Sequence, residues 1–166
     1  MDSRKRSTTL ICMTGLLTAM ITLMTAFIFH IPYGSHGGYI HFGDALIYIA
    51  AILLPRPYAL AAAMIGSGLA DLITAPLWLP ATVLIKGLMV LCFSSTDTPL
   101  LSTRNKMAPL FAAVICIGGY YLAEAILFGS FVTPVLAIPG NMIQSFGSWI
   151  IFLVIASALK RINKII

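Results

Sequence analysis

Four charged residues stand inside long apolar stretches of this sequence: Asp44, Asp71, Lys86 and Glu124. A charged side chain is expensive to bury in lipid, so each one indicates either a ligand site or a structural ion pair. Asp71 and Lys86 could form such a pair, which would leave Asp44 and Glu124 without a cation. Each would then be protonated or would accept hydrogen bonds from a ligand. For Asp44 the main expected role is at the start of a helix, where a carboxylate meets unpaired backbone N–H groups.

Uncharged polar and aromatic residues indicate the same region. Asn141 and Gln144 are three residues apart at the start of an apolar run, so they share one face of a helix near its positive end. Aromatic side chains at the same level could stack on a flat ring, or could form the aromatic belt of a membrane interface. They are Tyr39, His41, Trp78, Tyr120 and Tyr121. Since a dianion would need more Lys or Arg nearby, we expect a small, flat, polar ligand that is neutral or cationic.

The elements that must position these residues are membrane helices. Hydrophobic residues make up 60% of the chain and charged ones 9%, and the mean hydropathy is +1.00, which is typical of an integral membrane protein. We predict a single all-α membrane domain, residues 1–166, with six transmembrane helices; the second is short for a span and could be tilted or re-entrant. The predicted helices are 10–29, 43–54, 57–75, 78–93, 108–128 and 140–160.

The basic residues predict the orientation of these spans. Connections 30–41, 75–78 and 129–139 contain no Lys or Arg, so six alternating spans place the basic residues of the termini and the other connections on one face. Such a face is normally cytoplasmic, which predicts that both termini are inside the cell. The net charge of +5 then reflects topology, and we expect no nucleic-acid partner. These basic residues are Arg4, Lys5, Arg6, Arg56, Arg104, Lys106, Lys160, Arg161 and Lys164.

The connection 30–42 would hang over the polar site. Its glycines would allow it to act as a mobile lid, although an ordinary solvated turn is the alternative. Its histidines are spaced by six and five residues, which matches no strong ligand motif, so we expect no metal. These residues are Gly34, Gly37, Gly38, His30, His36 and His41.

Small residues and one serine suggest other roles. Gly15 and Ala19 form a Gly-x-x-x-Ala pair on the first helix, which favours either internal packing or docking of another membrane protein. Ser67, between two glycines, could suggest an intramembrane hydrolase, but the histidines lie far from it along the predicted helices, so we expect no enzyme. A stand-alone carrier is a further alternative, although no inverted repeat is recognisable.

Three stretches resemble a known family: Gly37-Gly-Tyr-Ile-His-Phe-Gly-Asp-Ala-Leu-Ile-Tyr-Ile-Ala-Ala51 continuing to Leu54-Pro-Arg-Pro-Tyr58, Gly66-Ser-Gly-Leu-Ala-Asp71, and Pro80-Ala-Thr-Val-Leu-Ile-Lys-Gly87. They resemble the substrate-binding S components of energy-coupling factor (ECF) vitamin transporters, in the branch assigned to hydroxymethylpyrimidine and vitamin B6 compounds. The resemblance implies a six-helix S-component bundle in the plasma membrane of a prokaryote, with the vitamin held near the outer surface under the loop between the first two helices.

The same resemblance implies partners. These are a transmembrane T component, which in the family contacts small residues of the first helix, here Gly15 and Ala19, and two ATPases. The chain has no phosphate-binding Gly-x-x-x-x-Gly-Lys-Ser/Thr loop, so we expect it to hold no cofactor of its own, with ATP bound by the partner ATPases.

The predicted ligand is hydroxymethylpyrimidine or pyridoxine, with thiamine or riboflavin as the alternatives. Only Trp78 and Trp149 are tryptophan, so the aromatic-rich cage of thiamine-binding relatives is not obviously reproduced. We expect Glu124 to accept from an amino or hydroxyl group and the two amides to bond ring heteroatoms. Lys86 would pair with Asp71 or a ligand oxygen. The predicted site is Tyr39, His41, Asp71, Trp78, Lys86, Tyr120, Glu124, Asn141 and Gln144.

Overall fold

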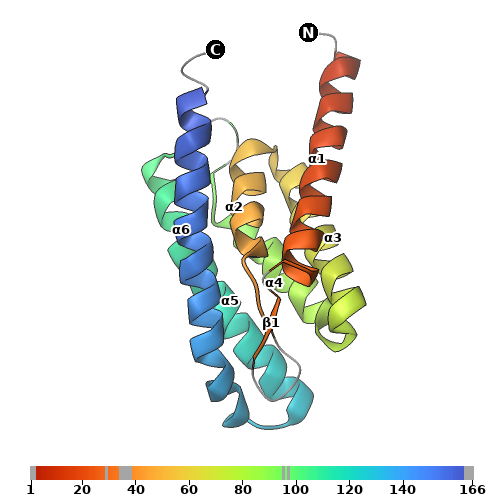
Figure 1. Cartoon of the computed structure of the whole chain (residues 1–166), viewed down its shortest axis with the longest axis vertical. Helices are drawn as coiled ribbons and strands as arrows, with labels where there is room; N and C mark the ends of the chain where they lie inside the picture. The colour runs from red at the N-terminus through yellow and green to blue at the C-terminus, as the bar shows by residue number, and fades with distance from the viewer. Residues whose placement is uncertain (1–2, 29, 34–38, 95, 97, 163–166) are drawn as a thin grey trace.

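Six α-helices make up most of the chain, in a computed structural model that describes residues 3–28, 30–33, 39–94, 96 and 98–162 (Figure 1). The helices are α1 (Ser3–Ala26), α2 (Gly43–Leu53), α3 (Arg56–Thr74), α4 (Leu79–Leu91), α5 (Thr103–Phe128) and α6 (Ile138–Ile162). Helix α1 begins seven residues before the predicted start, and α6 begins at Ile138 instead of 140. Each predicted apolar run therefore corresponds to a helix.

Four short elements lie in the connections, where the sequence predicted loops. Two two-residue strands pair antiparallel, with Ile31 opposite Ile40 and Pro32 opposite Tyr39, so the connection between α1 and α2 is a small hairpin. The two 3₁₀ helices lead directly into α4 and α6. The elements are β1 (Ile31–Pro32), β2 (Tyr39–Ile40), η1 (Pro76–Trp78) and η2 (Thr133–Ala137).

Within the described residues, four helical segments are long and apolar enough to cross a bilayer. They are Lys5–Ala26, Arg56–Thr74, Thr103–Phe128 and Thr133–Arg161, whereas Gly43–Leu53 and Pro76–Leu91 are shorter apolar helices. The chain is thus a membrane protein, while the count of six crossings stays a prediction.

Helix α2 explains why that count is difficult to predict. Its 11 residues extend about 16 Å at 1.5 Å per residue, roughly half of a hydrocarbon core of about 30 Å. Residues 43–52 are all buried, because α1, α3 and α6 pack around the helix. Since protein rather than lipid surrounds α2, it need not be long enough to span.

Local sequence signals set several helix ends. Pro57 stands in the first turn of α3 and Pro80 in the first turn of α4, positions where the missing N–H costs nothing. The Ser102 side chain caps α5 by accepting a hydrogen bond from Asn105 N. Gly129 ends α5 with a φ of 65°, a left-handed conformation that glycine adopts without strain.

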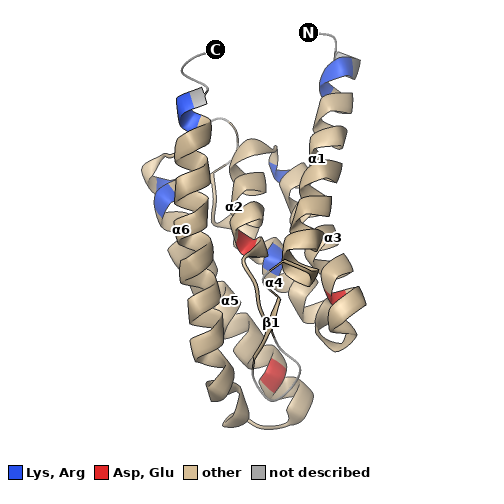
Figure 2. Cartoon of the chain, viewed as in Figure 1, with Lys and Arg blue, Asp and Glu red and all other residues tan. Residues whose placement is uncertain are grey.

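The two ends of the bundle differ in charge. Figure 2 shows most of the described Lys and Arg toward the end where both termini lie, with one further basic position near the middle, on α4. The acidic positions of α2, α3 and α5 lie in the middle and toward the opposite end. A basic end of this kind is what the positive-inside rule associates with the cytoplasmic face.

Candidate ligand-binding cavity

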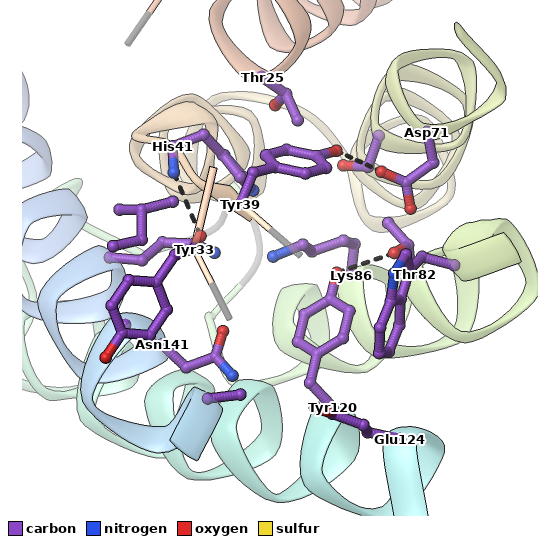
Figure 3. A pocket seen from close by; sticks show the side chains of 16 residues that line it. Thr25, Tyr33, Tyr39, His41, Asp71, Thr82, Lys86, Tyr120, Glu124 and Asn141 are labelled. Atoms are coloured by element: carbon purple, nitrogen blue, oxygen red, sulfur yellow. Dashed lines mark hydrogen bonds between the residues drawn. The ribbon is translucent and has the colours of Figure 1, made fainter. Parts of the chain in front are cut away.

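One cavity brings together the nine polar and aromatic residues that the sequence indicated. It contains about 670 Å³ of space free of atoms, counting its open mouth. The hairpin between α1 and α2 and helices α1, α3, α4, α5 and α6 all contribute to its lining (Figure 3). The predicted residues that line it are Tyr39, His41, Asp71, Trp78, Lys86, Tyr120, Glu124, Asn141 and Gln144.

Sequence reasoning missed seven further lining residues. Three of them, Thr25, Ser67 and Thr82, are buried and carry hydroxyl groups. Their type gives little signal, because serine and threonine are common in membrane helices and usually bond to their own backbone. The remaining residues are Tyr33, Ile40, Ala137 and Gly140.

A buried ion pair lies at the middle of the bundle. Lys86 Nζ donates to Asp44 Oδ1 over 2.7 Å, and both side chains are fully buried. The same Nζ lies 5.3 Å from the centre of the Tyr120 ring, which adds a cation–π contact. The expected pairing of Lys86 with Asp71 is therefore wrong: Asp44 is the partner, because the short helix α2 starts deep in the bundle instead of at its outer end.

Gln144 and His41 complete the hydrogen bonding around this pair. Gln144 Nε2 donates to Asp44 Oδ2 over 2.9 Å, and His41 N donates to Gln144 Oε1 over 3.3 Å. Gly43 N in turn donates to His41 Nδ1 over 3.0 Å. Asp44 thus lies in the first turn of α2, but its carboxylate accepts from the side chains of Lys86 and Gln144. We call Asp44, Lys86, Gln144 and His41 the ion-pair wall.

His41 is neutral in this arrangement. It lies in the connection before α2, and burial lowers its pKa to about 3. Because Nδ1 accepts the Gly43 N–H, the neutral ring carries its proton on Nε2.

A second polar wall has unmet hydrogen-bonding capacity. Tyr39 donates its hydroxyl to Asp71 Oδ1 (Figure 3), and burial raises the pKa of Tyr39, which keeps that hydroxyl protonated. Three buried oxygens of residues on the cavity lining have no hydrogen-bond partner within the described structure: Asp71 Oδ2, Thr25 Oγ1 and Ser67 Oγ. We call Thr25, Ser67 and Asp71 the open wall.

Aromatic rings form another side of the cavity. Trp78 is buried and meets Tyr120 edge to face, with ring centres 6.1 Å apart, and the Tyr120 hydroxyl lies 2.8 Å from Thr82 Oγ1. Tyr39 stacks on His30 at 4.0 Å. Tyr121 instead donates to Phe131 O over 2.7 Å and is absent from the lining described for the cavity.

Glu124 and Asn141 lie on the cavity side of α5 and α6. Glu124 is buried, and the half-buried Asn141 directs its amide into the cavity (Figure 3). Asn141 and Gln144 share a helix face, as their spacing predicted. Both polar atoms of Gln144 are already engaged by Asp44 and His41, so a ligand meets Asn141 more readily.

Two glycines of α6 allow the hairpin and the start of α2 to pack closely against that helix. A Cβ atom at Gly140 would lie 2.4 Å from the Tyr33 ring, and one at Gly147 would lie 2.3 Å from Phe42. The close approach therefore requires glycine at both positions. The predicted lid glycines Gly34, Gly37 and Gly38, together with His36, lie outside the described residues. Among those described, no group of histidine, cysteine or acidic residues could hold a metal.

Comparison with known proteins now identifies the family. The model of the family described as "ECF-type riboflavin transporter, S component" matches residues 5–161. The chain belongs to this family. Membership makes it a transporter subunit rather than an enzyme, and implies a small-molecule vitamin ligand and association with a T component and ATPases.

A solved structure and a sequence relative accompany this match. The structure, described as "Structure and mechanism of the S component of a bacterial ECF transporter", has a TM-score of 0.77 and 18% identity, covering 95% of this S component and 99% of that chain. At this identity it supports the fold alone. An uncharacterized protein from Pyrococcus woesei is 30% identical over 109 residues, which are 64% of this chain and 72% of that protein. The resemblance to S components is confirmed, whereas the hydroxymethylpyrimidine and vitamin B6 branch is not.

The predicted docking residues of this S component lie on its surface. Gly15 and Ala19 are exposed on α1 and line a shallow apolar groove that α3 completes with Tyr58, Ile65 and Leu69. No atom lies within 4 Å of the position that a Cβ at Gly15 would take. Internal packing therefore does not account for these two residues. Gly66 on α3 instead lies close to α1, because its Cβ would meet Thr18 O at 2.9 Å.

Proposed function

We propose that this S component captures a single-ring vitamin or precursor, hydroxymethylpyrimidine or pyridoxine, from outside the cell. A T component and two ATPases then drive its uptake. The observation that carries the proposal is the open wall, where three buried oxygens of Thr25, Ser67 and Asp71 have no partner within the described structure. Buried polar groups are normally hydrogen-bonded, so such a cluster beside a cavity is accounted for by a ligand that supplies the missing bonds.

The chemistry of the lining supports a flat ring with hydrogen-bonding substituents. Tyr39, Trp78 and Tyr120 present aromatic surface to the cavity, which suits stacking on a heterocycle. The carboxylates of Asp71 and Glu124 are acceptors for amino or hydroxyl groups, and the Asn141 amide both donates and accepts. Hydroxymethylpyrimidine and pyridoxine each combine one aromatic ring with such groups.

Riboflavin is the second candidate, because the matching family is named for it. It also presents a flat, uncharged ring system, but it is larger and carries a polyhydroxylated chain. Thiamine, with two rings, is a third candidate.

Thermal unfolding of the purified chain in detergent, with each of these four compounds in turn, tests the proposal. A compound that binds only the folded state raises the unfolding temperature as its concentration exceeds the Kd. We expect the largest rise with one of the single-ring compounds. A rise with riboflavin alone would replace the proposed ligand, and no rise with any of the four would contradict vitamin capture.

Two variants then locate the site. Glu124→Gln should weaken binding of the stabilising compound by about tenfold, because the amide presents only one acceptor oxygen where the carboxylate presents two. Tyr121→Phe is the matched control, since Tyr121 bonds Phe131 outside the cavity, and its affinity should stay within twofold of the unmodified chain. Equal affinities for both variants would remove Glu124 from the site.

We further propose that the groove at Gly15 and Ala19 receives the T component, with both termini in the cytoplasm. Gly15→Leu should abolish co-purification with the T component and ATPases while ligand binding remains. Gly118→Leu is the control, because Gly118 is likewise exposed with open space at its Cβ position but lies on α5. Loss of the partners in both variants, or in neither, would contradict this docking surface.

A further inference from the structure

Lys86 is the one basic residue among those known to line the cavity in the described part of the chain. The undescribed residues of the hairpin cannot add a Lys or Arg, because positions 29–42 contain neither. A phosphate group usually requires Lys or Arg, or a row of free backbone N–H groups, to offset its charge. Among the side chains known to line the cavity, Lys86 is therefore the one that could offset the charge of a phosphate ester.

The structure shows Lys86 engaged on two sides. Its Nζ bonds Asp44 Oδ1 at 2.7 Å with both side chains fully buried, and it lies over the Tyr120 ring. Asp44 is itself held in place, because Gln144 Nε2 donates to its other oxygen over 2.9 Å. Separating such a pair would leave two uncompensated charges in a medium of low dielectric constant, which is strongly unfavourable.

The remaining charges of the lining are acidic. With Lys86 balanced by Asp44, the side chains left are the carboxyl groups of Asp71 and Glu124. His41 adds no positive charge, since burial lowers its pKa to about 3. Among the described lining residues, a phosphate dianion would thus meet no Lys or Arg without an acidic partner, so no such side chain would offset its charge.

We propose that Asp44 is a specificity-determining residue of this site: by holding Lys86 in a buried pair, it makes the cavity reject phosphate monoesters and select the unphosphorylated vitamin. Asp44 acts through Lys86 and need not touch the ligand. Specificity of this kind arises from a penalty on the wrong ligand as well as from contacts with the right one. A phosphorylated vitamin outside the cell would have to be hydrolysed by a phosphatase before capture. This inference rests on the proposed function.

The test compares the free vitamin with its phosphate monoester on the purified full chain, by calorimetry. The pairs are pyridoxine with pyridoxine 5′-phosphate, hydroxymethylpyrimidine with its phosphate, and riboflavin with riboflavin 5′-phosphate. For whichever pair contains the stabilising vitamin, the ester should bind at least about 100-fold more weakly. Equal affinities would overturn the role of Asp44 while leaving vitamin capture intact. If no member of any pair binds, the proposed function fails and this inference fails with it.

Variants then assign the discrimination to the ion pair. Asp44→Asn frees Lys86, so the preference for the free vitamin should fall at least tenfold. Asp71→Asn is the matched control: it should weaken both compounds through the hydrogen bond that they share, but it does not free Lys86, so the ratio of their affinities should change much less. An equal fall in both variants would mean that total negative charge, not the pairing of Lys86, sets the preference.

A double variant keeps the test decisive if Asp44→Asn does not fold. Asp44→Asn with Lys86→Met contains neither buried charge and leaves no cation for the ester. Its preference for the free vitamin should lie within about threefold of the unmodified chain. A tenfold fall in the double variant would show that Asp44 repels the ester directly, and would overturn the role assigned to Lys86.

Discussion

The ion-pair wall and the open wall of the cavity are both built from polar side chains buried in an apolar bundle, yet they differ in their hydrogen bonding. In the ion-pair wall, Asp44 accepts hydrogen bonds from Lys86 and Gln144, and Gln144 accepts one from His41 N. In the open wall, Asp71 has one bonded and one unbonded oxygen. A polar residue in a membrane segment can thus either bond other residues of the protein or remain available to a ligand. Only its hydrogen-bond partners show which role it has.

Energetics separate the two walls further. A buried ion pair contributes little net stability, because desolvation offsets the attraction, but removing one partner is costly. An unbonded buried hydroxyl has already lost its contact with water, so removing it costs little. We therefore expect variants of the ion-pair wall to lose more stability than variants of the open wall. Variants of the open wall should instead lose more ligand affinity.

The largest effect is expected for Lys86→Met. Asp44 would keep its bond from Gln144 but lose its buried cation, which should destabilise the fold by about 3–5 kcal/mol. Adding Asp44→Asn should recover much of that loss, because no uncompensated charge remains. Thermal or denaturant unfolding in detergent measures both variants. A loss below about 1 kcal/mol for Lys86→Met would mean that water or another group compensates the charge of Asp44. The ion-pair wall would then not depend on Lys86.

The next effect is a pH dependence that His41 gives to the ion-pair wall. Burial lowers the His41 pKa to about 3, below its ordinary value of about 6.5 in an unfolded chain. The unfolded state therefore binds a proton that the folded state does not, so stability falls as the pH decreases from about 6.5 toward 3. The expected slope is at most about 1.4 kcal/mol per pH unit.

His41→Asn isolates this contribution. Its unfolding temperature should fall less than that of the unmodified chain between pH 6.5 and pH 5, because position 41 no longer titrates. Contributions from the other acidic and basic groups are common to both proteins, so the difference between the two profiles is the relevant quantity. Parallel profiles would show that His41 is not held neutral.

In the open wall, Asp71→Asn tests affinity instead of stability. The amide retains one acceptor oxygen but loses the charge, so binding of the stabilising vitamin should weaken by about 10- to 100-fold, as expected for a charge-assisted hydrogen bond. The unfolding temperature without ligand should change far less than for Lys86→Met. Calorimetric titration measures the affinity. A large loss of stability with unchanged affinity would mean that Asp71 has a structural role, like the residues of the ion-pair wall, and does not bind the ligand.

The sequence allowed much of this cavity to be predicted, because polar residues in apolar runs are rare and costly. It did not show the depth of Asp44, since hydropathy does not distinguish a spanning helix from an internal one such as α2. Two-residue strands are too short to produce an alternating pattern, so the hairpin was missed as well. The close contacts at Gly140 and Gly147 depend on neighbours from distant parts of the chain, which spacing within α6 does not reveal.

The hydroxyls of the open wall were missed for another reason. Thr14, Thr18 and Thr22 donate to the backbone carbonyl four residues earlier, over 2.7 to 3.0 Å, which is the usual behaviour in a helix. Thr25, one turn further along α1, has an unpartnered hydroxyl within the described structure. Nothing in the residue type separates Thr25 from the other three, so only the three-dimensional arrangement indicates its availability.

Ser67→Ala should produce the smallest effect and the sharpest distinction between the two walls. Its hydroxyl is fully buried without a partner, so the variant should be as stable as the unmodified chain within about 0.5 kcal/mol, or slightly more stable, when no ligand is present. If the vitamin bonds this hydroxyl, affinity should fall by about three- to tenfold, the usual value of one neutral hydrogen bond.

The same substitution at Ser94, whose hydroxyl bonds Asn105 Oδ1 over 2.7 Å, should cost stability and leave affinity unchanged. A stability loss at Ser67 as large as that at Ser94 would show that the Ser67 hydroxyl is already satisfied without ligand, and the open wall would then reduce to Thr25 and Asp71.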